Sequence, residues 1–162
     1  MFIVNHAAPK KTVDYYSLST AFDVSTATRD DDDEYSIAGQ EQRANSIAFN
    51  NDGTRMVVAG VGNNSQVRIH EYSLSTGFDL SSTVTHLNTQ DLISFQNHID
   101  GVTFNYDGTK MYTITLMNDA QDLMYQFKLT TPYDVSTLSL EGTYTVSSVS
   151  ADSREVVFSN DG

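Results

Sequence analysis

Hydrophobic and polar residues alternate along most of the chain with a period of two. Clear examples are residues 67–72 (VRIHEY) and 111–115 (MYTIT), which are rich in β-branched and aromatic side chains. Because successive side chains of a strand point to opposite faces of a sheet, this alternation predicts half-buried β-strands. No segment sustains the 3.6-residue period of an amphipathic helix. We therefore expect an all-β fold.

The alternating segments belong to an internal repeat with two recurring blocks. The block IAFNNDGTRM at 47–56 returns as VTFNYDGTKM at 102–111 and begins again as VVFSNDG at 156–162. The block YSLSTAFDVS at 16–25 returns at 72–81 and, with substitutions, at 127–136. The Asp-Gly glycines at 53, 108 and 162 are 55 and 54 residues apart, and the second block recurs after 56 and 55. Repeats of this length indicate stacked supersecondary units.

Each repeat is predicted to hold four antiparallel strands, A to D. The Asp-Gly turn separates strand A, which ends at Phe49, from strand B, because glycine adopts positive φ at no steric cost. Strand C ends at residues 72–74 (YSL), and strand D follows residues 78–81 (FDLS). Four such strands in roughly 40–55 residues form one blade of a β-propeller. The recurring apolar residues expected between blades are Phe49, Phe104, Phe158, Leu18, Leu74 and Leu129.

The repeat resembles the blades of propellers in the WD40/YVTN-like group, above all long-repeat propellers from phage and environmental-metagenome sequences. The resemblance rests on Phe-Asn-x-Asp-Gly-Thr-Lys-Met followed by Tyr-Ser-Leu-Ser-Thr-x-Phe-Asp-Val-Ser-Thr, and it covers essentially the whole chain. It implies a propeller fold and, for most such proteins, a binding or scaffold role. The chain contains no Trp and therefore lacks the Gly-His and Trp-Asp signature of true WD40 blades.

The phase of the repeat predicts that two copies complete one ring. Residues 1–162 form a single three-repeat unit, with repeats at about 1–46, 47–101 and 102–154. The first repeat lacks strand A, and residues 155–162 supply a strand A without a following strand B. Since propellers hold 4–8 blades, three blades do not close a ring. We expect a six-bladed homodimer in which strand 155–162 completes the first blade in trans; a homotrimer with nine blades is the alternative.

Composition excludes several classes of function. The formal net charge of −12 disfavours nonspecific nucleic-acid binding and anionic membranes, which attract clustered Lys and Arg. The chain has no apolar run long enough for a transmembrane helix. With no Cys, it has no disulfide framework and no thiol chemistry. The compartment is not indicated by these features.

Acidic residues and histidines offer few sites for chemistry. The run at residues 30–34 (DDDDE) could bind Ca²⁺, but it lacks the spaced ligands of a calcium loop, so we favour a charged outer strand that resists edge-to-edge pairing. Aspartates recur in the two turns, where we expect them to bond the local backbone; they are Asp52, Asp107 and Asp161 before glycine, and Asp23, Asp79 and Asp134 before strand D. The histidines, His6, His70, His86 and His98, show no metal-ligand spacing.

The loops that enter strand A are the best candidates for a ligand-binding rim at the mouth of the channel. Their polar residues are Arg43, Asn45, His98, Asp100, Asp152 and Arg154. An ordinary solvated loop is the alternative interpretation. No nucleophile elbow, P-loop or dinucleotide motif occurs, so no catalytic or metal-binding residue is assigned.

Three functions remain open. A non-catalytic binding or structural module, contacting a protein or a glycan, fits the symmetric repeat and needs no cofactor. A lactonase-like propeller hydrolase would need acidic residues and histidines that converge on a channel metal. A glycan-binding lectin would need Tyr or Phe in place of the Trp that commonly stacks on sugars.

Overall fold

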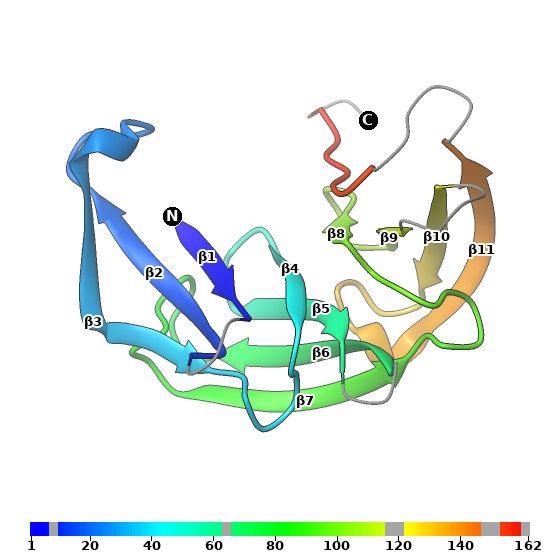
Figure 1. Cartoon of the computed structure of the whole chain (residues 1–162), viewed down its shortest axis with the longest axis horizontal. Helices are drawn as coiled ribbons and strands as arrows, with labels where there is room; N and C mark the ends of the chain where they lie inside the picture. Colours follow the sequence, from blue (N-terminus) through cyan, green and yellow to red (C-terminus); the bar gives the residue numbers. More distant parts are fainter. Residues whose placement is uncertain (7–9, 63–65, 116–121, 147–152, 160–162) are drawn as a thin grey trace.

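A computed structural model describes residues 1–6, 10–62, 66–115, 122–146 and 153–159 (Figure 1). The fold is all-β, and every pair of neighbouring strands is antiparallel. The first sheet has three strands, β1 (Phe2–Asn5), β2 (Thr12–Leu18) and β3 (Ala27–Ser36). The second has four, β4 (Ala44–Phe49), β5 (Arg55–Val61), β6 (Val67–Leu74) and β7 (Val84–Asp91). The third has β8 (Gly101–Phe104), β9 (Lys110–Thr115), β10 (Leu123–Leu129) and β11 (Leu138–Thr145).

The three sheets stand side by side along an open arc (Figure 1). The strands on the inside of the arc are neighbours, since β1 contacts β4 and β4 contacts β8. The first and third sheets lie at opposite ends of the arc, with the second between them. The expected order was B-C-D, A-B-C-D, A-B-C-D and a final A. The three sheets match it, but the final strand A is not formed by the described residues 153–159. The three sheets that the described residues of one chain form do not close into a ring.

The Asp-Gly turns have the chemistry that the sequence predicts. Gly53 and Gly108 adopt φ of 71° and 68°. The carboxylates of Asp52 and Asp107 each accept a hydrogen bond of 3.0 Å from the backbone N–H two residues ahead. The prediction for these two turns is confirmed; Asp161 lies outside the described residues.

The second set of aspartates bonds the local backbone, as expected, and two of the three cap short 3-10 turns. Asp23 caps η1 (Val24–Thr26) and Asp134 caps η3 (Val135–Thr137), each accepting from the backbone N–H of a serine two residues ahead at 3.0 Å. Asp79 accepts the corresponding bond from Ser81 at 2.9 Å. The hydroxyl of that serine also donates to the carboxylate and, as the largest effect, holds the pKa of Asp79 below its ordinary value.

Each pair of neighbouring sheets encloses its own hydrophobic core. Between the first and second sheets, Val13 packs with Met56 and Tyr72. Between the second and third, Val57 and Ile69 pack with the third-sheet residues. Of the core residues predicted from the repeat, Leu74 and Leu129 are buried, and Leu18, Phe49 and Phe104 are half-buried. Phe158 is exposed, because no further sheet packs on that side of the described chain.

The segment expected to form the extra strand A runs alongside β8 but is irregular. Residues 153–159 form no β-ladder with another described segment. A strand needs a hydrogen-bonded neighbour, and the ladders of the described strands do not include these residues. The aromatic ring of Phe158 lies on Tyr112 of β9, with 4.5 Å between ring centroids.

The acidic run lies in β3, the outermost strand of the first sheet, where we expected a charged edge. Glu34 pairs with Lys10 at 2.7 Å and with Arg29. The side chains of Asp30 and Asp31 lie outside the described ones, so Ca²⁺ binding here stays a prediction. Across the part of the chain that the structure describes, no helix is long and apolar enough to span a membrane.

Candidate functional site

The inner ends of the sheets meet at a small open pocket of about 310 Å³, here called the rim pocket. Three of its residues, Asn45, Asp100 and Arg154, each stand four positions before the phenylalanine of an Asp-Gly block, so the repeat itself brings them together. The complete lining is Val4, His6, Ala44, Asn45, Asp100, Arg154 and Glu155.

Hydrogen bonds and ion pairs fix the polar groups of the rim pocket. Asn45 Nδ2 donates to the carbonyl of Ile99 at 2.7 Å. The carboxylate of Asp100 is buried. Its Oδ2 lies 3.0 Å from His98 Nδ1, and its Oδ1 lies 3.6 Å from Nη1 of Arg154, whose side chain is exposed. The pocket therefore presents a fixed carboxylate beside an exposed guanidinium, which suits hydrogen bonding to a polar ligand.

The predicted rim residues are only partly brought together. Asn45, Asp100 and Arg154 line the pocket, whereas Arg43 and His98 do not. The backbone N–H of Arg43 donates to Glu41 Oε1 at 2.9 Å, which ties this residue to the buried connection between β3 and β4. Asp152 lies outside the described residues.

Sequence reasoning did not assign His6 and Glu155 to the pocket, although both line it. The signal for Glu155 was its place directly after Arg154 in the aligned loop. Partial desolvation raises the pKa of the Glu155 carboxyl above its ordinary value, and a hydrogen bond from the backbone N–H of Val156 lowers it in part. His6 follows β1 and shares no spacing with the other rim residues, so only the tertiary structure places it here.

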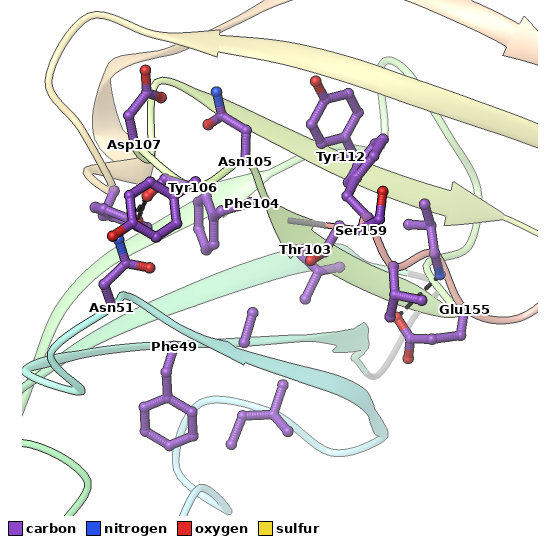
Figure 2. A pocket seen from close by; sticks show the side chains of 17 residues that line it. Phe49, Asn51, Thr103, Phe104, Asn105, Tyr106, Asp107, Tyr112, Glu155 and Ser159 are labelled. Carbon is purple, nitrogen blue, oxygen red and sulfur yellow. Dashed lines mark hydrogen bonds between the residues drawn. The ribbon is translucent and has the colours of Figure 1, made fainter. Parts of the chain in front are cut away.

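A larger cleft of about 1030 Å³ opens along β8, between the second sheet and residues 155–159 (Figure 2). Its walls carry aromatic rings, with Phe104 packed on Tyr133 at 5.2 Å between centroids. The carbonyl of Tyr106 accepts hydrogen bonds from Tyr133 Oη at 2.6 Å and Asn51 Nδ2 at 2.7 Å. This cleft lies among β4, β8 and the irregular segment, and it does not bring acids and bases together at one point.

A buried carboxylate from the β3–β4 connection also contacts an imidazole and, through it, a hydroxyl of the second sheet. Glu41 Oε2 is 3.5 Å from His70 Nε2, and His70 Nδ1 is 2.9 Å from Thr89 Oγ1. His86 Nε2 contacts the same hydroxyl at 3.0 Å, and burial is the main cause that lowers its pKa. None of these four residues lines either pocket. The cluster joins the β3–β4 connection to β6 and β7, so its role is structural.

No group of three metal-ligating side chains occurs among the residues for which the structure gives a placement. The hydrolase alternative needs such a group on the channel, and the rim pocket offers its acids, Asp100 and Glu155, beside the competing cation of Arg154.

Comparison of the chain with protein-family models, with curated proteins and with solved structures finds no match.

Proposed function

We propose that this chain is a non-catalytic binding or structural module, and that its three sheets are half of a six-bladed β-propeller completed by a second copy. The ring would place two rim pockets around one channel mouth. Each would offer hydrogen-bonding groups to a glycan or a protein ligand.

One observation carries the proposal: the face of the first sheet that points away from the second sheet is bare. Val24 is 69% exposed, whereas the residues at the same position of the repeat, Leu80 and Val135, are 4% and 0% exposed. Phe22 is 98% exposed, and its counterpart Phe78 packs on Phe49 with 5.4 Å between ring centroids. Where a preceding sheet covers these positions, Leu80 and Val135 are core residues and the exposed fraction of Phe78 falls to 43%.

The same difference extends along β1. Met1 and Ile3 are 39% and 43% exposed, whereas Met56 and Val58 at the same positions of β5 are fully buried. These exposed apolar residues of the first sheet therefore have the composition of a core between two sheets and lack only the covering sheet. A ring of two arcs supplies that cover at both ends of each arc.

The mass of the protein in solution tests the proposal. Size-exclusion chromatography with light scattering should give twice the chain mass of 17.9 kDa at micromolar concentration. A well-folded species of 17.9 kDa at all concentrations up to about 100 µM would contradict the two-copy ring. A stoichiometric, tightly bound metal ion in the purified protein would contradict the non-catalytic assignment and favour the hydrolase.

A further inference from the structure

We infer how the two copies join: residues 155–158 of one copy pair antiparallel with β1 of the other, with Val156 opposite Ile3. At the same junction the η1 turn of the second copy packs on the face of the third sheet that carries Tyr112 and Met124. This inference rests on the proposed two-copy ring and specifies its partner contacts.

The register follows from the two complete sheets. In the second sheet Phe49 pairs with Met56 and Ile47 with Val58. In the third sheet Phe104 pairs with Met111 and Val102 with Thr113. The same positions of the repeat are Phe158 with Met1, and Val156 with Ile3. A slip of one residue would turn every side chain of the strand to the opposite face. The apolar residues that must be buried therefore specify this register.

Residues 153–159 already lie where a following innermost strand belongs. Between the second and third sheets, Asn45 and Ser46 of β4 bond the backbone of Ile99 and Val102 at 2.7 and 3.0 Å. At the same place on β8, a Cβ added to Gly101 would meet the carbonyl oxygen of Arg154 at 2.9 Å and the Cα of Glu155 at 3.0 Å. The segment therefore packs against β8 much as β8 packs against β4, and its far edge can accept a strand.

The first sheet lacks the innermost strand that this segment would supply. Among the described residues β1 has one strand neighbour, β2, whereas β5 and β9 in the same position of their sheets each have two. An open strand edge is a template for β-augmentation. Adding residues 155–158 gives the first sheet the four strands of the other two.

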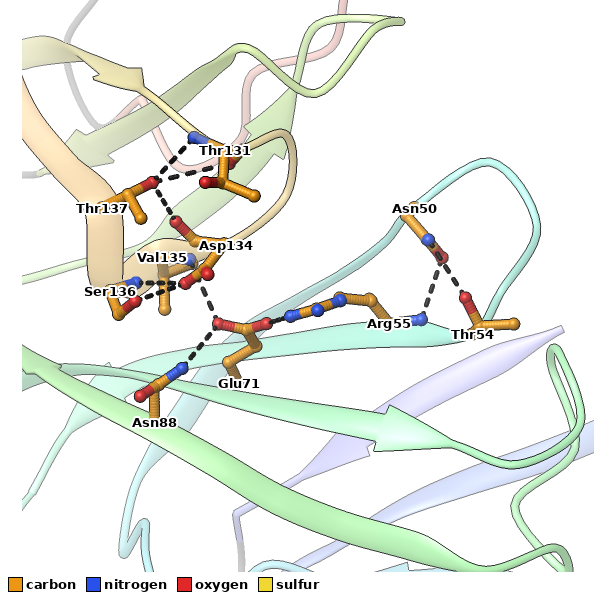
Figure 3. Close-up of polar contacts among 10 residues, drawn as sticks. All are labelled: Asn50, Thr54, Arg55, Glu71, Asn88, Thr131, Asp134, Val135, Ser136 and Thr137. Carbon is orange, nitrogen blue, oxygen red and sulfur yellow. Dashed lines mark hydrogen bonds and ion pairs between the residues drawn. The ribbon is translucent and has the colours of Figure 1, made fainter.

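The faces that would meet also correspond. The second sheet covers the third with Val57, Ile69 and Glu71, and the third sheet carries Tyr112, Met124 and Gln126 at the same positions. Glu71 Oε2 accepts the backbone N–H of Val135 at 3.1 Å (Figure 3). At the junction between copies, the side-chain oxygen of Gln126 would accept the N–H of Val24. The apolar Phe22 and Val24 would then be buried against Tyr112 and Met124.

Cysteine crosslinking tests the junction cleanly, because the chain has no cysteine. One chain carries only Ile3→Cys and another only Val156→Cys; the two are co-expressed and oxidised. Facing residues of antiparallel strands have Cα atoms about 4.5–5.5 Å apart, within the range for a disulfide. We expect a reducible covalent species of twice 17.9 kDa from the mixture and none from either chain alone.

Two control pairs define what the crosslink means. Ile47→Cys with Val58→Cys in one chain links the observed pair of β4 and β5 and shows that this position permits a disulfide. Val157→Cys with Ile3→Cys places the thiols on opposite faces and should not link. If light scattering shows a dimer but the disulfide forms only in the shifted pair Val157/Ile3, or in neither that pair nor Val156/Ile3, the register is overturned. The two-copy ring then still stands. A monomer would overturn both.

The doubly substituted chain Ile3→Cys/Val156→Cys reports the number of copies. A ring of two should yield a closed covalent dimer. A covalent trimer would keep the junction and overturn the two-copy ring, and a covalently closed monomer would overturn both.

A second variant tests the docked turn without cysteine. Val24→Asp should weaken dimerisation about a hundredfold or more, since it buries an unpaired charge at each junction. Leu87→Asp, on an exposed residue of β7, should leave the dimer unchanged. Equal dissociation constants for the two variants would overturn the role of the η1 turn.

Discussion

Glu71 is one of the side chains that join the second sheet to the third, and its replacement tests how neighbouring sheets are held together. It is fully buried on β6. Its carboxylate pairs with Arg55, accepts from Asn88 Nδ2 at 3.3 Å and accepts from the backbone N–H of Val135 at 3.1 Å (Figure 3). The last bond connects the second sheet with the third, and its two residues, Glu71 and Val135, are 64 positions apart in the sequence.

Glu71→Ala removes an acceptor from a buried N–H and leaves Arg55 without its carboxylate. A hydrogen bond to a charged group contributes about 1.5–3 kcal/mol, and breaking a buried ion pair costs about 3–5 kcal/mol. Arg55 is partly solvated, with 35% of its side chain exposed, so we take the lower end of the ion-pair figure. We expect a loss of about 3 kcal/mol in the free energy of unfolding. For a chain of this size that loss lowers Tm by about 6–12 °C.

Urea and thermal unfolding, followed by circular dichroism at a concentration where the chain is monomeric, measure this loss. Glu71→Gln keeps an oxygen for Val135 and should cost about 1–2 kcal/mol. The matched control is Gln126→Ala, at the same position of the third sheet, which should change the stability of the monomer by less than about 0.5 kcal/mol. If Glu71→Ala and Gln126→Ala destabilise the monomer equally, Glu71 does not act across the sheets, and the reasoning is refuted.

Three further predictions concern the turns and the rim. Gly53→Ala should lower Tm, because φ is 71° and the added Cβ would clash with ring atoms of Phe78. Gly142→Ala, with nothing within 4 Å, is the control, and equal Tm values would contradict the expectation. The depressed pKa of Asp79 means that its stabilisation is present above the pKa of the unfolded chain and is lost as pH falls through the lower pKa of the folded chain. Asp79→Asn should therefore flatten the fall in urea midpoint below about pH 4, and an unchanged slope would count against the cap. Gly101→Val should displace residues 154–155 and weaken dimerisation while the monomer stays folded, which light scattering and circular dichroism together can check; an unchanged dimer would show that this close approach is not needed.

Local rules were enough to predict the strands and turns. Alternation predicted β6 and β9, and the Asp-Gly pair at 52–53 predicted a turn whose glycine adopts positive φ, because both depend on residues close in sequence. The order of strands followed from the internal repeat. The irregular conformation of residues 153–159 was not predictable, because a strand there depends on a hydrogen-bonded neighbour that the local sequence does not supply.

The rim was predicted in part for a similar reason. Asn45, Asp100 and Arg154 share one position of the repeat, so a pattern in the sequence was enough to group them. His6 joins them through the packing of β1 against β4, a tertiary contact between residues that share no motif. The hydrogen bond from the Val135 N–H to Glu71 could not be predicted from the sequence either. The same position of the third sheet carries Gln126, so no acidic residue recurs there to draw attention to Glu71.

The two ends of the arc present unlike faces, one bare and apolar at Val24 and the other lined by Tyr112 and Gln126. Unlike faces make heterologous contacts, and such contacts close into a ring only when the rotation from one chain to the next divides a full turn evenly. The angle between neighbouring sheets sets that rotation. A substitution that splays the second sheet from the third would therefore change the mode of assembly as well as its strength. Chains joined by the same contacts would then advance along an axis and grow into a helical filament instead of closing.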